Sequence, residues 1–143
     1  MNQNIEFLNY ILQNAEMGKD SINDILGVAP QGDFKNVLTS QMNEYTTIYD
    51  QAKQMIEQAG KDAKHLNPMA KAATYVTTKM KTLTDKTPSH IAEMIIQGST
   101  MGIIDITKNL KKYPDATNEI KQLGQRLLTL EENNVNEAKR FLQ

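Results

Sequence analysis

The chain of 143 residues contains no cysteine and no tryptophan. Without cysteine it can form no disulfide, no Cys-ligated metal site and no thiol nucleophile. No apolar run approaches the roughly 18 residues that a membrane-spanning helix needs, and the N-terminal segment lacks the basic start and unbroken apolar core of a signal peptide. We therefore expect a cytoplasmic protein without a membrane span.

An excess of charge of either sign is also missing. The sequence has 16 Lys and Arg against 17 Asp and Glu, which gives a formal net charge of -1. The densest basic cluster, Lys108, Lys111 and Lys112, comes late in an expected helix, where cations interact favourably with the helix dipole. This balance provides no general attraction to nucleic acid, so we expect no nucleic-acid partner.

Signals for β-strands are absent as well, since there is no Asn-Gly or Asp-Gly turn and no alternating run of β-branched and aromatic residues. Instead, apolar residues recur at steps of three and four over 5–26, 34–59, 68–83, 88–113 and 116–142, which predicts five helices. Asn67-Pro68 and Thr87-Pro88 are typical helix starts. With 39% hydrophobic residues, we predict a single all-α domain over 1–143.

The lengths of these helices suggest an architecture. Four of them would be roughly 33–40 Å long, and the helix over 68–83 would be roughly 24 Å long. Residues 60–87 could then cross most of the bundle, so that the helices over 34–59 and 88–113 run in the same direction. One long crossover of this kind defines the ferritin-like four-helix bundle, here with an extra short crossover helix. The alternative is a five-helix up-down bundle.

The helix over 88–113 is apolar almost all the way round, so we expect it to be the most buried. Asp105 lies within it, between two isoleucines, and is the acid most expected in the core. A buried carboxylate needs a partner, and consecutive helices are usually neighbours, so we expect Asp105 to meet Glu131 and Asn134.

The apolar stripe of the last helix is interrupted by polar residues. Its members are Ile120, Leu123, Leu127, Leu130, Glu131, Asn134, Ala138 and Phe141. Three interpretations of Glu131 stay open: a solvated residue at the edge of the stripe, part of a buried hydrogen-bonded layer, or a metal ligand. Gln41 is the one polar residue in the stripe of 34–59, and we expect a satisfied core amide there. The predicted polar residues of the core are therefore Gln41, Asp105, Glu131 and Asn134.

Four acidic residues, Glu16, Glu44, Asp105 and Glu131, lie near the middle of four long helices. In this pattern the chain resembles the ferritin-like superfamily, whose di-metal members use a Glu from each of two helices and Glu-x-x-His from the other two. No Glu-x-x-His occurs, because Asn134 follows Glu131 and Thr47 follows Glu44.

The only histidines, His65 and His90, lie away from mid-bundle. The resemblance therefore implies a divergent member with the fold but without the metal chemistry, and we expect no metal or other cofactor. If a metal binds, the four acids would be its ligands and would favour a hard cation.

Catalytic motifs are absent too: the chain has no Gly-x-Ser-x-Gly, no phosphate-binding glycine loop and no His placed as a base. The segment Gly98-Ser99-Thr100-Met101-Gly102 falls inside a helix, where its small residues would permit close packing. We expect a non-catalytic bundle with a structural or protein-interaction role, through a protein partner or as a homodimer. The alternatives are a carboxylate-based metal-binding bundle and a binder of small apolar ligands.

Overall fold

The computed structural model describes residues 2–64 and 84–143. Within these residues it contains four α-helices and no strand: α1 (Gln3–Leu26), α2 (Asp33–Gln58), α5 (Pro88–Lys112) and α6 (Asn118–Lys139). The all-α prediction is confirmed. The predicted helix over 68–83 and His65 lie outside the described residues.

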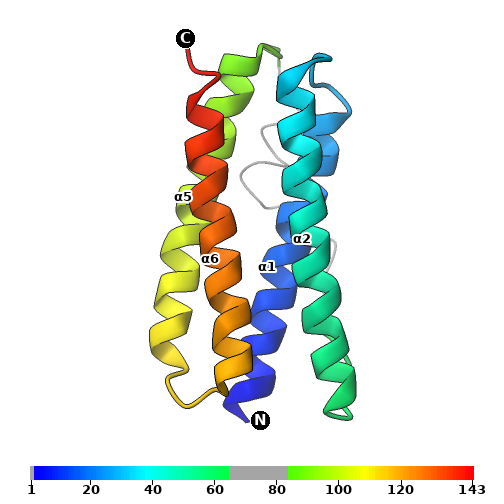
Figure 1. The fold of residues 1–143 in the computed structure, drawn as a ribbon, viewed down its shortest axis with the longest axis vertical. Coiled ribbons are helices and arrows are strands. Elements are labelled where there is room, and N and C mark those ends of the chain that lie inside the picture. Colours follow the sequence, from blue (N-terminus) through cyan, green and yellow to red (C-terminus); the bar gives the residue numbers. More distant parts are fainter. Residues whose placement is uncertain (1, 65–83) are drawn as a thin grey trace.

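The four helices form a bundle of two antiparallel pairs, α1 with α2 and α5 with α6 (Figure 1). Between the pairs, α2 packs on α6 and α1 packs on α5 and α6. At one end of the bundle the rings of Phe34 and Phe141 meet at 4.8 Å, and the Gln143 N–H donates to Ser89 Oγ at 2.9 Å. The first residues of α2 and α5 are therefore at the same end.

The opposite end is closed by contacts between the start of α1 and the turn from α5 to α6. The rings of Phe7 and Tyr113 stack at 5.3 Å, and the Thr117 N–H donates to Asn4 Oδ1 at 3.0 Å. As a result α2 and α5 run in the same direction, as expected if residues 60–87 span the bundle. The choice between a crossover helix and a fifth bundle member concerns 68–83, outside the described residues.

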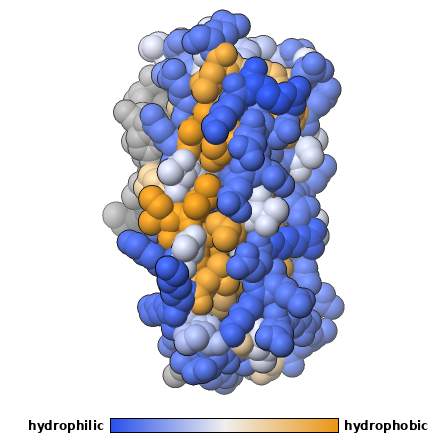
Figure 2. Space-filling model, turned by 60° about the vertical axis from the view of Figure 1, so that its left-hand side comes forward, coloured by the Kyte–Doolittle hydropathy of each residue, from blue (hydrophilic) through white to orange (hydrophobic). Residues whose placement is uncertain are grey.

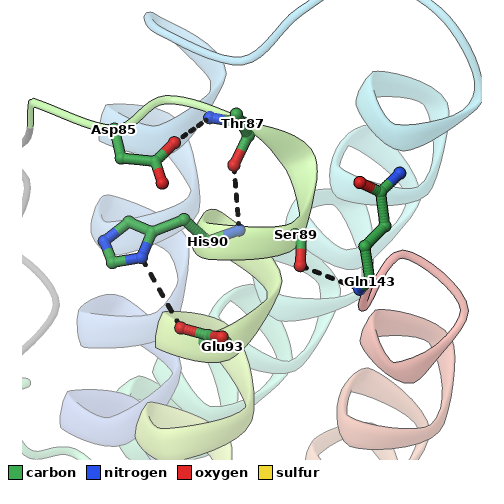
Figure 3. A network of polar contacts seen from close by, with 6 residues as sticks. All are labelled: Asp85, Thr87, Ser89, His90, Glu93 and Gln143. Atoms are coloured by element: carbon green, nitrogen blue, oxygen red, sulfur yellow. Dashed lines mark hydrogen bonds and ion pairs between the residues drawn. The ribbon is translucent and has the colours of Figure 1, made fainter.

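The start of α5 is fixed by short polar contacts (Figure 3). Thr87 Oγ1 accepts the backbone N–H of His90 at 3.3 Å, and Asp85 Oδ1 accepts the N–H of Thr87 at 3.0 Å. The His90 ring lies 3.5 Å from the Glu93 carboxylate on the surface. The Thr87-Pro88 start signal is therefore confirmed, and His90 belongs to the end of the bundle.

The core runs along the bundle axis, and every described helix contributes one apolar stripe to it. The expectation that α5 is the most buried helix is wrong, because Met101 and Ile104 are 54% and 50% exposed. Only one side of α5 faces its neighbours α6 and α1. Because apolar residues occur all round this helix, some of them are left on its solvent-exposed side.

Of the four described helices, none is long and apolar enough to span a membrane.

Candidate functional site

A layer of buried polar side chains crosses the middle of the bundle. Tyr45 comes from α2, Ser99 from α5, and Glu131 and Asn134 from α6, and all four are buried. The Tyr45 hydroxyl donates to Glu131 Oε1 at 2.7 Å and accepts from Asn134 Nδ2 at 2.9 Å. Hydrogen bonding by the Ser99 hydroxyl lowers the pKa of both Tyr45 and Glu131, so Ser99 belongs to the same cluster. One hydrogen-bonded cluster, the polar layer, thus joins three helices.

Two glycines make room for the polar layer. A Cβ added to Gly18 of α1 would overlap the ring of Tyr45, and one added to Gly102 of α5 would lie 2.9 Å from Glu131 Cδ. The Tyr45 ring and the Glu131 carboxylate therefore lie directly against backbone of neighbouring helices. The expected packing role of Gly102 is confirmed.

The burial of the polar layer alters its acid–base chemistry. Loss of solvent raises the pKa of Glu131 to about 7, although the hydrogen bonds from Tyr45 and Ser99 act to lower it. Burial and the neighbouring Glu131 raise the pKa of Tyr45 well above its usual range. Tyr45 therefore remains a hydrogen-bond donor, and Glu131 gains or loses its proton near neutral pH.

The predicted polar residues of the core have different outcomes. Glu131 and Asn134 are buried, which decides for the hydrogen-bonded layer among the three interpretations of Glu131. Gln41 is buried too, and neither atom of its amide has a partner among the described residues, so the expectation of a satisfied amide stays a prediction. Asp105 is exposed, and its predicted burial against Glu131 is wrong. The core-facing side of α5 passes through Ser99 and Ile106 and leaves Asp105 outside.

The four candidate metal ligands do not gather in one place. Glu16 and Glu131 are buried, Asp105 is exposed, and half-buried Glu44 faces Arg126, whose Nε lies 2.6 Å from Glu44 Oε1. Across the part of the chain that the structure describes, no group of three or more His, Asp or Glu side chains is placed to hold a metal ion. The four mid-helix acids therefore form no common metal site among the described residues.

Two members of the polar layer, Tyr45 and Ser99, were not among the predicted residues. Tyr45 falls in the apolar stripe of α2, because its aromatic ring counts as apolar in the spacing pattern although its hydroxyl is polar. A tyrosine in a core stripe needs a partner for its hydroxyl, so Tyr45 could have been paired with Glu131 from the sequence. Ser99 lies between Gly98 and Thr100, and the sequence gave no comparable signal that its hydroxyl belongs to the polar layer.

A groove runs between α2 and α6, beside the polar layer. Its volume is about 780 Å³, and it lies where the two antiparallel helices face each other. Amide side chains predominate in its lining: Asn36, Gln41, Asn133, Asn134 and Asn136. The groove therefore shares Asn134 with the polar layer and reaches outward from it to the surface.

Comparisons of the chain with models of protein families, with curated proteins and with solved structures give no match. The geometry of the polar layer, of the groove and of the outer face of α5 is therefore the basis for proposing a function.

Proposed function

We propose that the chain is a non-catalytic ferritin-like bundle that acts through protein interaction, by self-association. The observation that carries this proposal is the apolar outer face of α5. Met101 and Ile104 lie there, each at least half exposed, in the middle of a 25-residue helix. Large apolar side chains grouped on one exposed face are typical of interaction surfaces.

The helix arrangement supports the ferritin-like part of the proposal. Parallel helices α2 and α5 are joined by a long connection, and the helix pairs on either side of it are antiparallel. One long crossover within a four-helix bundle is the defining feature of that topology.

The polar layer supports a role without metal. Ferritin-like di-metal sites are built from inward-facing carboxylates and imidazoles of four helices. Here the inward-facing groups at mid-bundle include Tyr45, Ser99, Glu131 and Asn134, whose hydrogen bonds are made to one another. Asn134 stands where the Glu-x-x-His pattern would have its His, and a neutral amide is a weak ligand for a transition metal.

The outer face of α5 is defined by Glu93, Gln97, Met101, Ile104, Lys108, Lys111 and Lys112, which follow one another mainly at three- and four-residue steps. Figure 2 shows an apolar stripe along the side of the molecule where α5 lies. The exposed apolar side chains are central on this face, with acid toward one end and lysines toward the other.

This charge order fits a second copy of the same helix. If two α5 helices pair antiparallel about a two-fold axis, Met101 of each copy meets Ile104 of the other. Glu93 precedes the midpoint of that contact by as many residues as Lys112 follows it. Antiparallel pairing thus places Glu93 of each copy beside Lys112 of the other, whereas parallel pairing would place lysines against lysines.

Sedimentation equilibrium over a wide range of protein concentration tests the proposal. We expect reversible dimer formation that Met101→Lys weakens by tenfold or more, with an unchanged circular dichroism spectrum because Met101 is exposed. Glu93→Lys should also weaken the dimer, and adding Lys112→Glu should restore it. Asn43→Lys, on the exposed side of α2, is the matched control and should have no effect.

A monomer at every concentration, or a dimer that tolerates Met101→Lys, would contradict self-association through α5. Two further measurements separate the alternatives. Stoichiometric metal in the purified protein would favour a carboxylate metal site, and a co-purified lipid in the native mass spectrum would favour an apolar-ligand binder.

A further inference from the structure

The helix α6 carries a second row of residues besides the stripe that it contributes to the core. Every member of this row is at least partly exposed, and the members follow one another at alternating steps of four and three residues. The row, called the α6 flank from here on, consists of Lys121, Gln125, Leu128, Glu132, Val135 and Lys139. Such alternating steps are typical of a seam along which a helix packs on another helix.

The α6 flank lies beside α5. Gly124 and Glu131 of α6 lie against residues of α5. Leu128 follows Gly124 by four positions and Val135 follows Glu131 by four positions, so both lie on the side of α6 that faces α5. The opposite side of α6 lines the groove toward α2. Figure 2 shows that apolar surface on the α5 side of the molecule extends over most of its length.

The outer face of α5 is too small to form a typical dimer interface by itself. It has seven residues, of which only Met101 and Ile104 are large and apolar. A specific, stable interface has about 20–30 residues on each side. We propose that each copy of the dimer docks its α5 against the α6 flank of the other copy as well as against its α5. This inference rests on the self-association through α5 proposed above.

The register of α5 and α6 within one copy follows from their contacts. Leu110 lies against Gly124, and the two helices run in opposite directions. Lys112 is two residues beyond Leu110, and Lys121 is three residues before Gly124. The two lysines therefore lie at nearly the same level of the bundle, close to the turn from α5 to α6.

This register places opposite charges across the proposed interface. Antiparallel pairing of the two α5 helices brings Glu93 of one copy beside Lys112 of the other, and hence to the level of Lys121 as well. The Glu93 side chain is 57% exposed, and none of the ion pairs among the described residues involves Lys121. The same register puts Met101 of one copy level with Leu128 of the other. The α6 flank thus extends both the apolar centre and the charged end of the interface.

The register also creates one unfavourable contact. Lys139, at the end of α6, comes level with Lys111 of the other copy, so two lysines face each other at the edge of the interface. Like charges at close range repel each other. Lys121 and Lys139 carry the same charge on the same flank, yet Lys121 would strengthen the dimer and Lys139 would weaken it. Reversing each charge separately should therefore have opposite effects.

Sedimentation equilibrium of two charge-reversal variants tests the proposal. Lys121→Glu should weaken the dimer about fivefold or more, because each symmetric dimer contains this contact twice. Lys139→Glu should strengthen the dimer about threefold. Lys53→Glu, on the exposed side of α2, is the matched control, since it makes the same change in net charge and should have no effect. Both effects should decrease at high salt, which screens exposed charges.

Failure of this inference is distinguishable from failure of the proposed function. A dimer that Met101→Lys weakens, but that neither Lys121→Glu nor Lys139→Glu changes, would overturn docking on the α6 flank and leave self-association through α5 intact. Changes of the same sign in both variants would also overturn it, because they would follow net charge alone. A monomer at every concentration would overturn the proposed function and this inference with it. Circular dichroism checks that both variants keep the native helix content.

Discussion

Glu131 is a carboxylic acid held in the core by neutral groups. Its hydrogen-bond partners are the hydroxyls of Tyr45 and Ser99, and none of the ion pairs among the described residues involves it. Its folded-state pKa of about 7 is above the value of 4.5 for an unperturbed Glu. The folded protein therefore binds a proton more tightly than the unfolded chain, and ionising Glu131 destabilises the fold.

The first prediction concerns the pH dependence of stability. Glu131 contributes full stability below about pH 4.5, loses it as the pH rises to about 7, and changes little above that. The loss corresponds to roughly 3 kcal/mol at one pKa unit per 1.36 kcal/mol. Glu131→Gln keeps an acceptor for Tyr45 without a charge, so we expect its free energy of unfolding to exceed that of the native sequence at pH 8 and to approach it near pH 5.

Urea denaturation of both proteins from pH 5 to pH 8 gives this comparison, and the difference between them cancels the other titrating groups. Glu132→Gln is the control, because Glu132 is the exposed neighbour and should give a difference that does not depend on pH in this way. A constant difference between Glu131→Gln and the native sequence would show that Glu131 is ionised throughout.

Glu131 also shows which features of the local sequence predict burial and which do not. Glu131 and Asn134 were identified as core candidates because they continue an apolar stripe at helical spacing, and they are buried. Asp105 was identified by its apolar neighbours in the chain, and it is exposed. Spacing along a helix specifies a face, whereas neighbours at the next position point in other directions. The stripe was therefore the reliable signal.

At the scale of helices, the close approach of α1 and α2 depends on one glycine. Gly18 has no side chain, and the Tyr45 ring occupies the space where a Cβ would be. The ring has little freedom to move, because its hydroxyl is held by Glu131 and Asn134. Gly18 lies on the same face of α1 as the buried residues Ala15 and Ile22, which is the face that packs on α2.

The second prediction is that Gly18→Ala destabilises the fold by about 1–3 kcal/mol through overpacking. Alanine is intrinsically the better helix former by up to about 1 kcal/mol, so a loss of stability would come from the contact with Tyr45. Thermal denaturation measures the effect. Gly27→Ala is the control, where the added Cβ would meet only Asp24 O at 3.3 Å, and we expect a much smaller change. Equal effects of the two substitutions would exclude the crossing as the cause.

The outer face of α5 shows that the apolar pattern of a single helix does not predict which molecule covers it. An apolar residue on every side of a helix predicts burial on every side, yet Met101 and Ile104 face outward. The sequence does not distinguish a helix enclosed by its own chain from one covered by another molecule, because burial removes apolar surface from water in both cases. The exposure of these two residues became visible only with the helix packing.

For the whole molecule, the sequence predicted the helical class and the common direction of α2 and α5, but it did not predict the groove. Gln41 and Asn134 belong to helices whose facing sides are defined only after the bundle is assembled. They become neighbours in one groove only through three-dimensional packing, and no spacing rule along one helix predicts it.

The final prediction tests the topology on which the ferritin-like part of the proposed function depends. Cysteines introduced at Gln31 and Lys86, two exposed residues preceding α2 and α5, can carry spin labels because the native chain has no cysteine. Pulsed electron resonance should give a short distance for this pair. Labels at Glu57 and Lys86 should be farther apart by a distance approaching the length of α2, which for 26 residues is about 39 Å. Dilution with excess unlabelled protein removes distances between copies. If Lys86 were nearer to Glu57 than to Gln31, α5 would run opposite to α2, and the ferritin-like arrangement would be excluded.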